Sequence, residues 1–208
     1  FIEVLKLNTL EQRTDSTQIM PHIKWAGRLA LAYDVLVQAV KACPSDILTQ
    51  ELQSVLETRY KTDLLYRTKS SETKGKLESI LLLLQHLLDR LKPHSYLLEK
   101  EEIQLLKRFL TEQAHWDESK WKAKENKEIS SRSLQSAYDP DATYREKGGK
   151  KYKGYVANLT ETCSQDNPVQ LLTDYHLAPN TTSDIELLQN RLPEIKERMP
   201  LEDLYADG

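Results

Sequence analysis

The stretch Gly148-Gly149-Lys150-Lys151-Tyr152-Lys153-Gly154-Tyr155-Val156 decides how the fold of this 208-residue chain is interpreted. It opens a C-terminal part in which a strand, a turn, a second strand, a helix and a last strand follow one another. That part closes with Leu204-Tyr205-Ala206-Asp207-Gly208. This order places the carboxylate of Asp207 at the C-terminal edge of the last strand. Open α/β sheets bind their ligands at that edge, so we expect Asp207 to belong to a functional site.

Three other segments have the composition or the alternation of strands. Residues 10–19 are rich in β-favouring side chains towards their end and predict the first strand. Residues 155–160 and 169–177 alternate with a period of two, and the turn-forming residues 164–168 lie between them. These two segments predict a β-hairpin. Residues 1–7 are a short amphipathic piece that fits either a helix or a strand.

A helix is predicted between the hairpin and the last strand. Ser183 and Glu186 have the spacing of a capping box, in which each side chain bonds a backbone N–H of the first helical turn. We expect this helix to be perturbed or restarted at Pro193, and residues 201–207 to form the last strand. Ile185, Leu188 and Leu192 recur at helical spacing through the predicted helix.

The middle of the chain has helical periodicity. Apolar residues recur at intervals of three and four over residues 29–40, 48–56, 77–91 and 103–110. Pro44 ends the first of these helices, and Ser45 is expected to cap the second. Lys92-Pro93 ends the third, because proline lacks the N–H that continues a helix. Residues 69–76 are polar and predict a loop.

Residues 117–132 mix Lys, Glu and Ser densely, and two interpretations stay open. The first is a solvated helix end or linker. The second is a basic segment that contacts a nucleic-acid backbone, although interspersed glutamates weaken it. The residues that would make this contact are Trp116, Trp121, Lys120, Lys122, Lys124 and Lys127.

Taken together, these segments predict an α/β fold with a large all-helical insertion after the first strand. The order is strand, helical insertion, β-hairpin, helix and strand. A structureless connection of that length would be unusual in a compact domain, so the insertion is expected to form a subdomain. The expected divisions are residues 1–20 for the first core strand, 21–133 for the insertion and 134–208 for the remaining core.

Composition excludes several classes of protein. The net charge is −3 with 29% charged residues, so nucleic-acid binding would have to come from local basic patches. Cys43 and Cys163 lie far apart and form no disulfide or zinc pattern, which is typical of a reducing compartment. No apolar run approaches the roughly 18 residues of a transmembrane helix. We therefore expect no membrane span.

Asp15 and Asp207 are the acids most suited to chemistry. If the first and last strands are neighbours, both carboxylates converge on one sheet edge. Mg²⁺ prefers carboxylate oxygens, and paired ions of this kind promote in-line phosphoryl displacement. The alternative is that each aspartate only caps or terminates its strand.

Several short segments, in order along the chain, resemble DDE-type transposases of bacterial insertion sequences. They are Gln12–Ile19 (QRTDSTQI), Tyr138–Tyr144 (YDPDATY), Gly148–Tyr155 (GGKKYKGY), Asn167–Val169 (NPV), Ala178–Thr182 (APNTT) and Leu204–Gly208 (LYADG). The resemblance implies a partial RNase H-like core in which Asp15 and Asp207 are catalytic residues and metal ligands. Two Mg²⁺ or Mn²⁺ ions are implied in the complete enzyme, which cleaves DNA and transfers the strand. It further implies a bacterial cytoplasmic protein.

The resemblance also implies that this chain is a fragment of that enzyme. The third acid, a glutamate, would lie after Gly208, and the DNA-binding region would lie before Phe1. DNA at the transposon ends is the implied partner, together with a second copy of the chain in a homodimer. Lys150, Lys151 and Lys153 are candidates to hold DNA phosphates, the alternative being a solvated turn. Arg28 lies where such proteins often carry an arginine and is the fourth candidate for DNA binding.

Two other functions stay open. The chain could be a catalytically inactive remnant that binds DNA or the full-length transposase. It could also be a helical interaction module with no role on nucleic acid. Asp139 and Asp141 compete with Asp15 and Asp207 as candidate site acids. The main interpretation is that they form a turn, and the other is that they lie near the mouth of the site.

Overall fold

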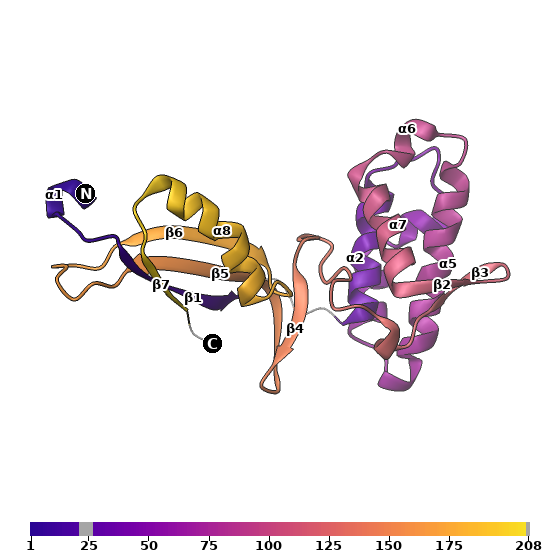
Figure 1. The fold of residues 1–208 in the computed structure, drawn as a ribbon. Coiled ribbons are helices and arrows are strands. Elements are labelled where there is room, and N and C mark those ends of the chain that lie inside the picture. The colour runs from indigo at the N-terminus through magenta and orange to yellow at the C-terminus, as the bar shows by residue number, and fades with distance from the viewer. Residues whose placement is uncertain (21–26, 207–208) are drawn as a thin grey trace. The chain divides into compact units, whose positions relative to one another are not determined.

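A computed structural model describes residues 1–20 and 27–206, and Figure 1 shows their helices and strands. The chain forms two compact units. Residues from both ends build the first unit, Phe1–His22 with Asp141–Gly208, and the second comprises Ile23–Pro140. The sequence pattern predicts that the insertion ends at residue 133, whereas the contacts put the end of the second unit at Pro140.

The first unit contains a mixed sheet, which confirms the α/β class. β1 (Glu11–Ile19) is antiparallel to β5 (Lys150–Thr162) and parallel to β7 (Asp203–Ala206). β5 pairs with β4 (Thr143–Lys147) over its first residues and with β6 (Leu172–Pro179) over its last. The order β6–β5–β1–β7 confirms the first strand, the hairpin and the last strand.

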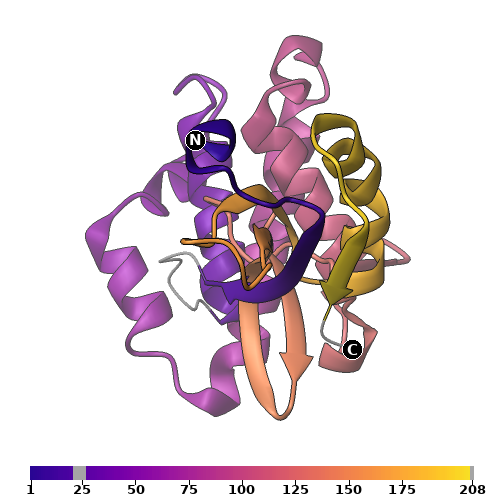
Figure 2. The same ribbon diagram turned by 60° about the vertical axis from the view of Figure 1, so that its left-hand side comes forward.

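A two-stranded ribbon extends from this sheet. It consists of β4 and the first part of β5, drawn in orange in Figures 1 and 2. Gly148 and Gly149 form its turn with φ of 59° and 74°, a conformation that glycine adopts without steric cost. β4 is an addition to the predicted strands. At the other end of the unit, the undecided residues 1–7 contain the short helix α1 (Ile2–Leu5).

One face of the sheet is covered by α8 (Asp184–Arg198), which connects β6 to β7 (Figure 1). The predicted cap is confirmed, because the Ser183 hydroxyl accepts a hydrogen bond from the Glu186 N–H. Of the apolar residues along α8, Ile185 is 70% exposed, whereas Leu187 and Ile195 are buried.

The predicted restart at Pro193 is wrong, because α8 is continuous through this residue. Arg191, before the proline, and Arg198, after it, both bind the buried carboxylate of Asp174 on β6. Arg191 donates from Nε and Nη2 over 3.0 and 2.8 Å. Both halves of the helix are therefore held to the same strand, which offsets the lost backbone hydrogen bond.

The second unit is built around three long helices, α2 (Arg28–Lys41), α5 (Thr73–Leu91) and α7 (Glu101–Gln113). Their apolar stripes enclose one hydrophobic core, in which Leu84, Leu106 and Phe109 are fully buried. These helices confirm the predicted periodicity. None of the described helices has both the length and the apolar composition to cross a membrane. The shorter elements are α3 (Gln50–Ser54), α4 (Thr58–Leu65), η1 (Ser70–Glu72), α6 (Ser95–Leu98) and η2 (Asn126–Glu128).

Two predictions at helix starts are wrong. Ser45 does not cap the second helix, because residues 44–48 form tight turns and Thr49 accepts the capping bond from the Leu52 N–H. Serine and threonine both have cap chemistry, so composition does not choose between them. Residues 69–76 are not a loop throughout, since η1 lies within them and α5 begins at Thr73.

The insertion is not all-helical, which corrects the fold prediction in detail. β2 (Ala114–Asp117) and β3 (Lys120–Ala123) form a hairpin, with the Trp116 and Trp121 rings 5.5 Å apart edge to face. Its turn uses Glu118 at φ 52° instead of the usual Asn or Gly. The sequence therefore carries no turn signal at this position.

We predict that Asp174→Asn lowers the free energy of unfolding of the first unit by about 3 kcal/mol, because it leaves two arginines without their buried partner. Burial raises the pKa of Asp174, but the hydrogen bonds and charges of Arg191 and Arg198 outweigh it and lower the pKa. The stabilisation is therefore present above the unfolded-state pKa of about 3.9 and is lost as the pH falls through the folded-state pKa. Urea unfolding at several pH values measures it.

The exposed Asp166→Asn is the control for this prediction, with an expected change below about 0.5 kcal/mol. Equal stability of the two variants near neutral pH would contradict a stabilising role for the Asp174 cluster.

Candidate functional site

Asp15 lies in the middle of β1, on the face of the sheet opposite α8. Along β1 the side chains alternate, so that Gln12 and Thr14 are buried while Arg13 and Asp15 are exposed. The Asp15 carboxylate accepts a hydrogen bond of 2.6 Å from the Ser16 N–H. Its own register partner is Leu159 on β5. Asp15 is thus an exposed acid held on the central region of the sheet.

The last strand runs beside Asp15, as predicted. β7 is parallel to β1, and the final pair of the described register is Thr14 with Ala206. In the sequence, Asp15 follows Thr14 and Asp207 follows Ala206. Asp207 itself lies outside the described residues. The adjacency of the two strands is confirmed, and the convergence of the two carboxylates stays a prediction.

Two cavities meet at this position. One, of about 410 Å³, lies on the exposed face, and the other, of about 310 Å³, reaches towards α8 and the ribbon. Thr14, Asp15 and Ala206 line both of them. The end of β7 and the middle of β1 therefore border open space on two sides, where a ligand can approach the Asp15 carboxylate.

The larger cavity is lined by one basic residue, Arg13, and two acids, Asp15 and Glu161. Arg13 donates from Nε to the Glu161 carboxylate over 2.6 Å, which pairs these two charges across the β1–β5 ladder. Apolar side chains surround the pair, including Leu159 and Tyr205, which are 37% and 55% exposed. Arg13 and Glu161 offset each other, which leaves the Asp15 carboxylate as the net charge among these lining residues.

The smaller cavity is polar and carries both signs of charge. Arg145 and Lys147 of β4 line it together with Asp15 and Asp184. The Ser16 hydroxyl donates to the Asp184 carboxylate over 2.6 Å. Sequence reasoning assigns Asp184 only to the helix start. Its contact joins residues that are 168 positions apart, and no spacing in the sequence signals it.

The described residues contain no group of three or more His, Cys, Asp or Glu side chains that could hold a metal ion. The predicted metal ligands are a pair, of which only Asp15 is described. Its carboxylate oxygens are donors that Mg²⁺ and Mn²⁺ prefer.

The three predicted DNA-binding lysines all lie on the ribbon. Lys150 and Lys151 are exposed at its turn, and Lys153 is half-buried nearer the sheet. Burial lowers the pKa of Lys153. Because successive strand residues point to opposite faces, Lys150 does not share a face with Lys151 and Lys153. The ribbon therefore divides the three lysines into two sets.

Arg28, the fourth predicted DNA-binding residue, begins α2 in the second unit. Its guanidinium donates to the backbone carbonyls of Gln113 and Lys124. Burial lowers the pKa of Arg28, opposed by the nearby charges of Glu125 and Glu128. These contacts join the ends of α7 and β3 to α2, and a contact with DNA stays a prediction for this residue.

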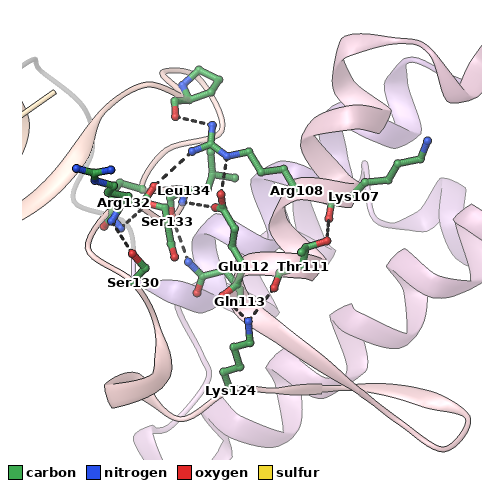
Figure 3. Close-up of polar contacts among 12 residues, drawn as sticks. Lys107, Arg108, Thr111, Glu112, Gln113, Lys124, Ser130, Arg132, Ser133 and Leu134 are labelled. Atoms are coloured by element: carbon green, nitrogen blue, oxygen red, sulfur yellow. Dashed lines mark hydrogen bonds and ion pairs between the residues drawn. The ribbon is translucent and has the colours of Figure 1, made fainter. Parts of the chain in front are cut away.

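The remaining polar cluster of the second unit holds its C-terminal segment in place (Figure 3). Glu112 accepts from the Leu134 N–H over 2.6 Å and from Arg108 over 2.9 Å. Lys124 donates to the Thr111 and Glu112 carbonyls at the end of α7 over 2.8 and 3.2 Å. Cations are favourable at that end of a helix. These contacts connect α7 to the segments that contain Lys124 and Leu134, so the cluster has a structural role.

Two other groups of residues named from the sequence have structural contacts: the lysines of residues 117–132 and the Asp-Pro-Asp segment. Lys122 forms an ion pair with Asp117 across the hairpin. Lys124 donates to a backbone carbonyl at the end of α7. Pro140 and Asp141 lie in a turn, which confirms the main interpretation of the Asp-Pro-Asp segment.

Comparison of the chain with protein-family models, with curated proteins and with solved structures gave no match. The function is therefore argued from the residues and their arrangement.

We predict that Arg28→Gln destabilises the second unit by about 2 kcal/mol, because two carbonyl groups lose charge-assisted hydrogen bonds. Thermal unfolding of the purified chain measures the change. Arg59→Gln is the control, since Arg59 is exposed and lies 3.7 Å from its nearest acid, Asp63. An Arg28 variant as stable as the control would show that the two carbonyl contacts contribute little.

Proposed function

We propose that this chain is a segment of a DNA transposase of the DDE type and that Asp15 is one of its catalytic carboxylates. The observation that carries the proposal is the parallel pairing of β1 with β7. It ends at Thr14 and Ala206, the residues that immediately precede Asp15 and Asp207. Two acids that follow paired residues of adjacent strands are the arrangement the proposal requires.

The order of the strands supports the same proposal. In the first unit, β5 is antiparallel to β1 on one side and to β6 on the other. β7, which follows α8, is parallel to β1. We infer that this is part of an RNase H-like core. The resemblance of the sequence motifs implies that fold, and the observed pairing is consistent with it.

The chemistry proposed for Asp15 is metal coordination. Bound Mg²⁺ or Mn²⁺ ions supply Lewis acidity and stabilise the leaving oxygen in an in-line phosphoryl displacement. Asp15 is suited to hold such an ion because its carboxylate is exposed and borders two cavities. Asp207 is proposed as the second ligand from its place in the sequence.

DNA is the proposed substrate, and the ribbon is its proposed contact. Lys150, Lys151 and Lys153 form a local group of positive charges in a chain whose net charge is −3. Lysines of this kind bind phosphates by displacing condensed counterions. The proposed DNA substrate is the ends of the transposon. The proposed oligomeric state is a homodimer, and the proposed location is the bacterial cytoplasm.

Isothermal titration of the chain with Mn²⁺ tests the acidic pair. We expect a millimolar site in the wild-type chain and its loss in both Asp15→Asn and Asp207→Asn. Asp166→Asn, which removes an exposed acid from the same unit, is expected to retain the site. Circular dichroism spectra of all four proteins establish that the fold is unchanged.

Mn²⁺ binding that persists in Asp15→Asn would contradict the proposed metal site at Asp15 and Asp207, and with it most of the catalytic assignment.

A further inference from the structure

The two faces of the β4–β5 ribbon differ in charge. Residues directly opposite each other in an antiparallel pair point to the same face. The register places Lys147 opposite Lys150 and Arg145 opposite Tyr152, which defines one face, named here the cationic face. The other face carries Glu146 opposite Lys151 and Tyr144 opposite Lys153. The cationic face therefore has three basic residues and no acid.

The opposite face is partly neutralised by its own acid. Glu146 lies across from Lys151 and accepts a hydrogen bond of 3.1 Å from the Tyr144 hydroxyl. On the cationic face, Lys147 and Lys150 are exposed, and no ion pair within residues 1–20 and 27–206 involves either ammonium group. Like charges directly across a ladder destabilise it. An anion bound between the two lysines would remove that repulsion.

The base of the ribbon is fixed to the sheet. Arg145 donates from Nη1 to the carbonyls of Asn180 and Thr182 over 3.1 and 3.3 Å, in the loop before α8. Asn180 is fully buried and accepts from the Thr143 hydroxyl over 2.8 Å. Its side chain also donates to the Tyr152 carbonyl over 3.3 Å. These bonds hold the cationic face in a set orientation towards the sheet.

The cationic face continues into the candidate site. Arg145 and Lys147 line the same cavity of about 310 Å³ as Asp15. A polyanion that lies along Lys150 and Lys147 therefore reaches the cavity that Asp15 borders. Arg145 is a positioning residue in this arrangement, since its guanidinium is engaged by two carbonyls.

We propose that the cationic face, through Lys147 and Lys150, binds the phosphates of duplex DNA and directs the backbone to the cavity that Asp15 borders. The opposite face, with Lys151 and Lys153, does not make this contact. Duplex DNA fits because its major groove admits a two-stranded β-ribbon. The inference rests on the proposed function, adds Lys147 to the DNA-binding set and removes Lys151 and Lys153 from it.

The experiment compares two variants that lose the same charge. Lys147→Gln/Lys150→Gln removes the two lysines of the cationic face. Lys151→Gln/Lys196→Gln removes one lysine from the opposite face and one exposed lysine of α8. Binding of both variants and the wild type to a fluorescent duplex is measured by anisotropy over a range of salt concentrations.

For the first variant we expect the slope of log K against log salt to fall by about 2, because each lost phosphate contact contributes about 0.9. Affinity at low salt should fall at least about tenfold, while the second variant stays within about twofold of the wild type. Circular dichroism spectra check that both variants remain folded.

Equal weakening by the two variants would overturn the assignment to one face and leave the transposase proposal standing. Tighter binding of the wild type to single strands than to the duplex would overturn the choice of duplex DNA. No binding to either would overturn the inference entirely. The Mn²⁺ titration separately tests the acidic pair, so the two failures are distinguishable.

Discussion

The pairing of β1 with β5 on one side and β7 on the other is the interaction on which the first unit depends. β1 comes from the start of the chain, and both of its partners come from beyond residue 140. Closing so long a connection as a flexible loop carries an entropic cost that rises only slowly with its length. A helical unit with its own hydrophobic core, such as Ile23–Pro140, shortens the flexible part of that connection.

The first unit makes up for a small apolar core with hydrogen bonds. Its buried apolar cluster consists of Val156, Ala178 and Leu187. Between the sheet and α8 the buried residues are largely polar, and they bond one another: the Thr14 hydroxyl donates to Asn158 over 3.1 Å. A buried polar group without a partner would cost free energy. The unit therefore tolerates few changes of register, because each one would break several of these bonds.

The sequence predicts those elements whose side chains repeat with a regular period. The long helices and the strands 10–19 and 155–160 are found because packing on one face imposes that period. The hairpin β2–β3 is missed because Glu118 takes a positive φ that its residue type does not signal. The continuity of α8 through Pro193 is missed for another reason, since contacts with Asp174, distant in sequence, decide it.

The candidate site shows the same division between local and distant information. Asp15 can be predicted because it lies within a short motif on a predicted strand. Asp184 and Lys147 cannot, because their place in the cavity with Asp15 depends on the pairing of β1, β4 and β5.

A shift of one residue between β1 and β5 would turn every side chain to the other face. Asp15 would then lie beneath α8, where polar groups need a partner, and Thr14 would be exposed in its place. The bond between Thr14 and Asn158 holds the register that keeps Asp15 at the surface. The constraint that stabilises the sheet is thus also the one that makes its carboxylate available to a ligand.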